Sequence, residues 1–86
     1  MEEGYFTLKI LSLKGELFEG DVSHFSAKSL IGDFDILKNH INFVSILLPG
    51  KIKYLEKALK EEAVITIDNG ILVLTNNQAK VFVNFT

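Results

Sequence analysis

Apolar and polar residues alternate one by one in several short segments of this chain, and this period of two restricts its fold more than any other feature. The alternation is clearest in YFTLKIL at 5–11 and in AKVFVNF at 79–85. Successive side chains of a β-strand point to opposite faces of a sheet, so these segments are typical of half-buried strands. Further extended segments are expected at 17–18, 22–29, 43–48, 51–56, 63–67 and 71–75.

Residues that favour turns separate the extended segments. Gly15 centres a turn, EGD at 19–21 is expected to interrupt the next strand, and PG at 49–50 is a strong turn pair. DNG at 68–70 predicts a hairpin between its flanking strands, because asparagine and glycine tolerate positive φ. NNQ at 76–78 predicts the following turn.

The segment EKALKEE at 56–62 contains good helix formers but is too short for a stable helix, so it predicts a wide hairpin end or one helical turn. No crossover helix that could join parallel strands is visible. The length of 86 residues suits one small domain. We therefore predict a single all-β domain over 1–86, an antiparallel β-sandwich or flattened barrel of about 8–10 short strands.

The composition narrows the classes of function. Hydrophobic residues make up 48% of the chain, as in globular domains, and the absence of cysteine excludes disulfides and thiolate metal sites. The net charge is −2, and the nine basic residues are all lysines spread among acids, which argues against nucleic-acid binding. No apolar run approaches the roughly 20 residues that span a bilayer. We expect a soluble protein that meets a membrane only through a partner.

The side chains that could carry chemistry do not form a recognised motif. His24 and His40 lack the spacing of a metal site, and Asp33 and Asp35 lack the further acids of a calcium loop. Phosphate-binding loops and nucleophile elbows are also missing from the sequence. No catalysis, metal or cofactor is therefore predicted. A free-standing β-sandwich for protein interaction or small-ligand binding stays open, and so does a small enzyme with converging carboxylates in a cleft.

Four motifs follow one another over nearly the whole chain. The pattern G-x-x-F-x-G-x-V is matched by Gly15, Phe18, Gly20 and Val22. The patterns G-E-F-G-I-L-P-G-H-A-P-L, L-x-P-G and G-G-x-L-x-V-x-x-N-x-V-x-V are matched at 32–43, 47–50 and 69–81. In this order and spacing, the chain resembles the N-terminal domain of the epsilon subunit of F-type ATP synthases.

The chain departs from the second pattern in its central part. Asp35 replaces a glycine, and the residues P-G-H-A-P become KNHIN at 38–42. Asn39 can still adopt the left-handed conformation of the glycine that it replaces. The loss of both prolines leaves the segment less restricted in its conformation.

The resemblance implies a non-catalytic rotor subunit that links the gamma subunit to the membrane c-ring and helps to couple proton or sodium translocation to ATP synthesis. It implies a peripheral location at the cytoplasmic face of the inner (plasma) membrane. Epsilon subunits typically continue into a C-terminal helical hairpin that can inhibit ATP hydrolysis. This sequence ends on its last strand, so we expect the hairpin and its inhibition to be absent.

The resemblance also implies partner-binding residues in a loop that faces the c-ring. These residues are Gly32, Asp33, Phe34, Asp35 and His40. The two aspartates would complement the basic and polar loops of the ring. The aromatic ring would pack beneath the loop, and the histidine would fix the loop by hydrogen bonding.

Overall fold

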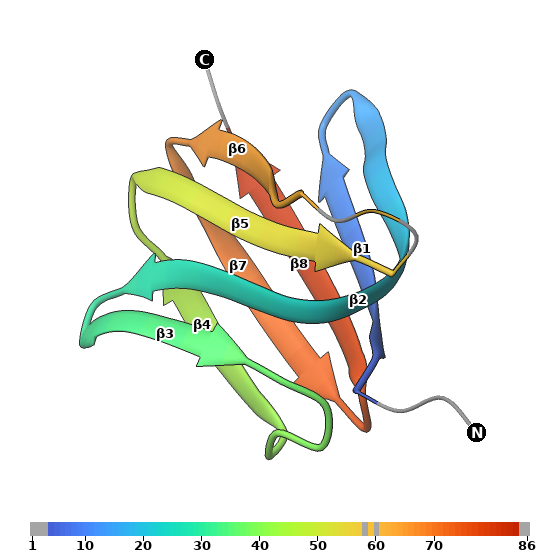
Figure 1. The fold of residues 1–86 in the computed structure, drawn as a ribbon. Helices are drawn as coiled ribbons and strands as arrows, with labels where there is room; N and C mark the ends of the chain where they lie inside the picture. The colour runs from blue at the N-terminus through green and yellow to red at the C-terminus, as the bar shows by residue number, and fades with distance from the viewer. Residues whose placement is uncertain (1–3, 58, 60, 85–86) are drawn as a thin grey trace.

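The computed structural model describes residues 4–57, 59 and 61–84, and every regular element in these ranges is a β-strand (Figure 1). The strands are β1 (Phe6–Ser12), β2 (Gly15–Ser29), β3 (Gly32–Ile36), β4 (Phe43–Leu47), β5 (Gly50–Glu56), β6 (Ala63–Ile67), β7 (Asn69–Thr75) and β8 (Gln78–Asn84). The predicted all-β class and the strand number are confirmed.

The strands form two layers that β2 connects. One layer has the order β1–β8–β7–β4, and the other places β2 between β3 and β5, with β6 outermost. In Figure 1 the layer containing β2, β3 and β5 crosses in front of β7 and β8. β2 is 15 residues long and pairs with β1 through its first half and with β3 and β5 through its second half. This arrangement is the predicted sandwich.

One strand pair departs from the antiparallel pattern. β1 and β8 run parallel, from Thr7 opposite Gln78 to Leu11 opposite Phe82, whereas the other strand pairs are antiparallel. The two strands come from the two ends of the sequence. Parallel neighbours need a connection of about a dozen residues or more, and here the rest of the domain is that connection.

The predicted break at 19–21 is wrong, because β2 runs through it without interruption. Gly20 lies opposite Leu8 in the ladder with β1. The ring of Phe18, two residues away on the same face, lies over Gly20, and a Cβ built there would come within 3.1 Å of its Cζ. The backbone ladder and this covering ring keep the glycine in the strand, so glycine here does not mark a turn.

The hairpin predicted at 68–70 is also wrong. β6 pairs with β5, and β7 pairs with β4 and β8, so the chain crosses from one layer to the other at Asp68. A type I′ turn would need positive φ at both central residues, and neither Asn69 nor Gly70 has it. Gly70 is required for another reason: a Cβ there would lie 2.7 Å from the carbonyl oxygen of Phe82. The glycine permits close approach of two backbones.

Other turn predictions hold. The turn at Gly15 joins β1 to β2, and Asn76 and Asn77 have φ of 49° and 62°, as a tight β7–β8 hairpin requires. In the segment 56–62, the amide of Leu59 donates to the carbonyl of Glu56 at 3.1 Å, which makes one turn. Residues 58 and 60 of that segment lie outside the described part of the chain.

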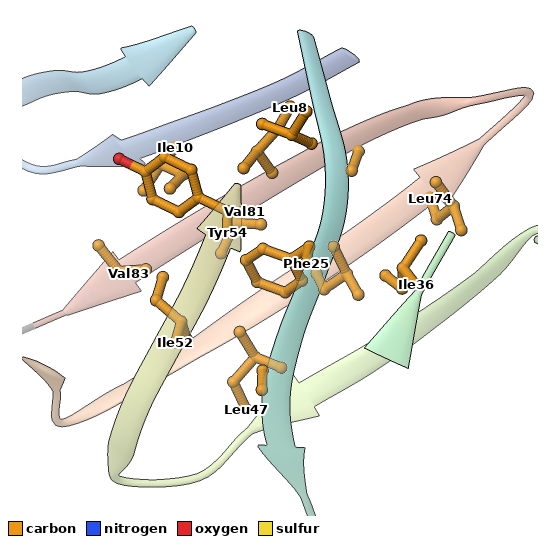
Figure 2. Close-up of a cluster of buried hydrophobic side chains, with 14 of the residues drawn as sticks. Leu8, Ile10, Phe25, Ile36, Leu47, Ile52, Tyr54, Leu74, Val81 and Val83 are labelled. Carbon is orange, nitrogen blue, oxygen red and sulfur yellow. The ribbon is translucent and has the colours of Figure 1, made fainter. Parts of the chain in front are cut away.

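The hydrophobic core fills the space between the layers. Each strand directs alternate side chains inward, and Phe25 at 0% exposure occupies the middle of the cluster (Figure 2). The side chains labelled around it in Figure 2 are Leu8, Ile10, Ile36, Leu47, Ile52, Tyr54, Leu74, Val81 and Val83.

Tyr54 makes the stability of this core dependent on alkaline pH. Burial, and secondarily the charge of Glu56, raise the pKa of Tyr54 above its ordinary value of 10.0. As pH rises above 10, the unfolded chain ionises at this tyrosine before the folded chain does, so the unfolded chain binds fewer protons and the free energy of unfolding falls. Below pH 10 both states keep the proton and the effect vanishes.

We expect Tyr54→Phe to lose less stability than the wild-type chain when the pH rises from 8 to 11. These values are about two units below and about one unit above the ordinary tyrosine pKa. Urea unfolding at the two pH values measures the difference. The rest of the sequence is common to both proteins, so its contribution cancels in the comparison. An equal loss in both proteins would show that Tyr54 does not contribute.

Candidate functional site

The first half of the segment predicted as a ring-facing loop is a strand. Residues Gly32–Ile36 form β3, which pairs antiparallel with β2, with Asp33 opposite Lys28 and Asp35 opposite Ser26. The two aspartates alternate with Phe34 and Ile36, which is the period of a half-buried strand. The segment was predicted as a loop because glycine and acidic residues are common in loops. Its polar and apolar residues nevertheless alternate as they do in an edge strand.

The side chain of Phe34 packs against the interior of the domain, beneath the segment, as expected. Its ring meets the ring of Phe43 edge-on at 5.8 Å between centroids, and it lies against the buried core. This contact joins β3 to β4 across the two layers. Phe34 therefore anchors the inner face of β3 to the core. Asp33 and Asp35 lie on the outer face of the strand.

His40 lies in the turn that follows β3, and hydrogen bonds hold it there. Its Nδ1 donates to the carbonyl of Ile41 at 2.8 Å, and its backbone amide donates to the carbonyl of Leu37 at 3.2 Å. The imidazole centroid is 5.0 Å from that of Phe43. A carbonyl only accepts, so Nδ1 carries the proton. This geometry agrees with the expected structural role of the histidine.

The structure does not bring the five candidate residues together at one place. Asp33 lies next to the β2–β3 turn, whereas His40 follows the opposite end of β3. A strand rises about 3.3 Å per residue, so Asp33 lies about 10 Å along β3 from the end of the strand at Ile36, after which His40 follows. Gly32, Asp33 and Asp35 form one candidate contact region, and His40 belongs to another.

Lysines that the sequence analysis did not single out surround the two aspartates. Lys28 on β2 and Lys51 and Lys53 on β5 share with Asp33 and Asp35 the lining of an open hollow of about 480 Å³. All five side chains point outward from the β3–β2–β5 layer. The mixture of charges suits recognition of polar or charged loops of a partner, and the hollow is open to solvent.

The outer surface of the opposite layer is apolar. Ile46, Ile71, Phe82 and Leu11 lie side by side in register across β4, β7, β8 and β1. Ile71 is 47% exposed and Phe82 is 48% exposed, and Val44 continues the surface along β4. We call these five residues the apolar face.

The sequences of β4 and β7 indicate this apolar face, but the sequence analysis did not predict it. The strands FVSIL and ILVLT are apolar at almost every position, so they cannot bury both of their faces in one thin core. A contiguous apolar surface on a small domain is typical of a site that a partner covers. Leu13 extends the apolar face into a shallow hollow of about 370 Å³ that Leu11, Ile71 and Phe82 also line.

His24 forms an ion pair with one acid. His24 donates from Nε2 to a carboxylate oxygen of Glu62 at 2.6 Å, which ties β2 to the 57–62 connection. Among the residues for which the structure gives positions, no cluster of three or more His, Asp or Glu side chains could hold a metal ion. Likewise, none of the chain described here forms a helix of the length and apolarity needed to cross a bilayer.

The fold and its surfaces define the class: a small β-sandwich domain with one apolar and one charged outer face. The family follows from comparison with known proteins. Residues 5–85 match the family model described as ATP synthase, Delta/Epsilon chain, beta-sandwich domain. The chain belongs to this family, which confirms the resemblance to the N-terminal domain of epsilon subunits.

Curated relatives agree with this assignment. The ATP synthase epsilon chain of Dichelobacter nodosus is 33% identical over 73 residues, which are 85% of this chain and 50% of that protein. The ATP synthase epsilon chain of Nitratiruptor sp. is 32% identical over 76 residues, 88% of this chain and 58% of that protein. The chain thus spans between half and three fifths of the length of these relatives.

Solved structures share the fold at low sequence identity. A chain in the cryo-EM structure of Euglena gracilis mitochondrial ATP synthase, comprising OSCP, F1 and c-ring, matches with a TM-score of 0.85 and 14% identity. The match covers 96% of this chain and 52% of that one. A chain in the central stalk and c-ring of the Tetrahymena thermophila mitochondrial enzyme matches with a TM-score of 0.73 and 17% identity, over 91% and 62% of the two chains.

Proposed function

We propose that this chain is a non-catalytic subunit of the central stalk of an F-type ATP synthase. In this role it links the gamma subunit to the c-ring, turns with the rotor, and helps to couple ion translocation to ATP synthesis. It works at the cytoplasmic face of the membrane, which it reaches through the complex. Membership of the epsilon β-sandwich family over residues 5–85 supports this role most strongly.

The two outer faces suit two different partners. The apolar face is the surface for the gamma subunit, because a stable subunit contact needs a desolvated apolar centre. The charged region at Gly32, Asp33 and Asp35 is the surface for the polar loops of the c-ring, since complementary charge selects and orients such a contact. His40, at the other end of β3, holds the turn that leads from β3 into β4.

A cysteine at position 33 tests this orientation. The chain contains no cysteine, so Asp33→Cys introduces a single thiol. We expect a short crosslinker, attached to the thiol of the Asp33→Cys variant and photoreactive at its other end, to join this chain to a c-ring loop in the assembled enzyme. Val44→Cys, which is on the apolar face, should crosslink to gamma in the same assay.

Two results would count against the proposal. Crosslinking of the c-ring from position 44 but not from position 33 would reverse the orientation. Failure of the wild-type chain to co-purify with gamma would remove the subunit role altogether and leave a free-standing interaction or ligand-binding β-sandwich as the alternative.

A further inference from the structure

Four asparagines join two turns that are far apart in the sequence. The amide of Asn39 donates to Oδ1 of Asn77 at 2.6 Å, and Nδ2 of Asn77 donates to Oδ1 of Asn39 at 3.0 Å. In the same way, the amide of Asn76 donates to Oδ1 of Asn42 at 2.8 Å, and Nδ2 of Asn42 approaches Oδ1 of Asn76 at 3.5 Å. We call these two reciprocal pairs the asparagine clasp.

The clasp needs asparagine at these positions for two physical reasons. Asn39, Asn76 and Asn77 have φ of 68°, 49° and 62°, a region that asparagine enters more easily than other residues with a side chain. A carboxamide also donates and accepts at once, so each pair can close in both directions. A backbone N–H can donate only to oxygen, and this fixes the orientation of the Asn77 and Asn42 amides.

The clasp restrains the connection between β3 and β4. This connection leaves β3 at Ile36, passes through Asn39 and Asn42, and enters β4 at Phe43. β3 itself is a strand of five residues, and among the described residues β2 is its one strand neighbour. The clasp therefore holds the C-terminal end of β3 to the β7–β8 hairpin of the other layer. The contact between Phe34 and Phe43 is a second link between the two layers.

We propose that the asparagine clasp positions β3 for docking by holding its C-terminal connection rigid. In the sequence pattern that this segment resembles, prolines stand where Lys38 and Asn42 stand here, and a proline restricts the backbone without any partner. Here the restriction comes from hydrogen bonds to a second hairpin. The asparagines are positioning residues: they act on Asp33 and Asp35 through β3. This inference rests on the proposed function, which assigns those aspartates to the c-ring contact.

The test removes one pair of the clasp without disturbing the backbone. Asn39→Gly and Asn77→Gly keep positive φ accessible, and they are made singly and together. Asn69→Ala, which changes an exposed asparagine outside the clasp, is the control. We expect amide hydrogen exchange over residues 33–42 to become about tenfold faster in the double variant, while exchange at the buried centre of β2 stays within about twofold of wild type. Asn77→Gly alone should show most of this effect, because the Asn77 side chain takes part in both bonds of the pair. Asn39→Gly should show less, because the backbone amide of residue 39 can still donate to Oδ1 of Asn77.

The second readout is docking. In the assembled enzyme carrying Asp33→Cys, the Asn39→Gly/Asn77→Gly background should lower the crosslink yield to the c-ring several-fold, and Asn69→Ala should not. A uniform rise of exchange throughout the chain would mean that the clasp only stabilises the fold, and it would overturn the inference. Local loosening with an unchanged crosslink yield would overturn it as well.

The outcome that defeats the proposed function is separate. If position 33 fails to crosslink to the ring even with the clasp intact, then the assignment of β3 to the c-ring is wrong, and the claim that the clasp serves this docking falls with it. The exchange experiment would still report whether the clasp orders residues 33–42. A drop in yield confined to the clasp variants supports both statements together.

Discussion

Replacing Ile71 by aspartate is expected to weaken binding to the gamma subunit by about 100-fold or more while the domain stays folded. Ile71 lies in the middle of the apolar face on β7, between strands β4 and β8, and is 47% exposed. Hot-spot residues at the centre of an interface contribute about 2 kcal/mol or more each, and a buried carboxylate without a partner adds a desolvation penalty. A hundredfold loss corresponds to about 2.7 kcal/mol.

The measurement is a titration of the variant into a catalytic head that contains gamma and lacks this subunit. Val64→Asp is the matched control, because Val64 is 50% exposed on the outer surface of the other layer and receives the same new charge. Equal affinities of wild type and Ile71→Asp, or an equal loss with Val64→Asp, would show that the apolar face is not the gamma surface. Urea unfolding of both variants separates a loss of binding from a loss of fold.

The strand signals in the sequence were sufficient for the fold class because they are local. The alternation at 5–11 and 79–85 reports which face of a strand is buried, and the pair Asn76–Asn77 meets the positive φ of a tight hairpin. These features depend on neighbours in the chain. They required no knowledge of which strand lies beside which.

Glycine was the least reliable of the local signals. Gly20 lies inside a continuous strand beneath the ring of Phe18, and Gly70 allows the carbonyl of Phe82 to approach. In both cases a side-chain or backbone contact from elsewhere explains the glycine, whereas its presence in the sequence suggested a turn. The parallel pairing of β1 with β8 was equally out of reach, because it joins the two ends of the chain.

The same limit applies to the candidate site. The carboxylates of Asp33 and Asp35 are exposed, and their contact with the c-ring stays a prediction, but the strand geometry that separates them from His40 was not predicted. The departures at 38–42 suggested a looser segment. The asparagine clasp compensates for the missing prolines through partners 34 and 38 residues away, and a single sequence gives no measure of such pairs.

Phe25→Ala is expected to destabilise the domain by about 3–5 kcal/mol, the usual cost of removing a buried aromatic ring. Phe25 is 0% exposed and lies opposite Ile36 on one side and Tyr54 on the other, at the centre of the cluster in Figure 2. A domain of this length has a total stability of about 4–13 kcal/mol, so the variant loses a large part of it. Urea unfolding should show a lower midpoint with an unchanged m-value.

Phe82→Ala supplies the contrast, since the same residue type is 48% exposed on the apolar face. We expect this variant to lose about 1 kcal/mol of stability, in proportion to the smaller area it buries, and yet to bind gamma at least tenfold more weakly. Phe25→Ala should bind with nearly wild-type affinity under conditions where it is folded. A large stability loss at position 82 with unchanged binding would mean that this ring belongs to the core, and the apolar face would then lack its central aromatic contact.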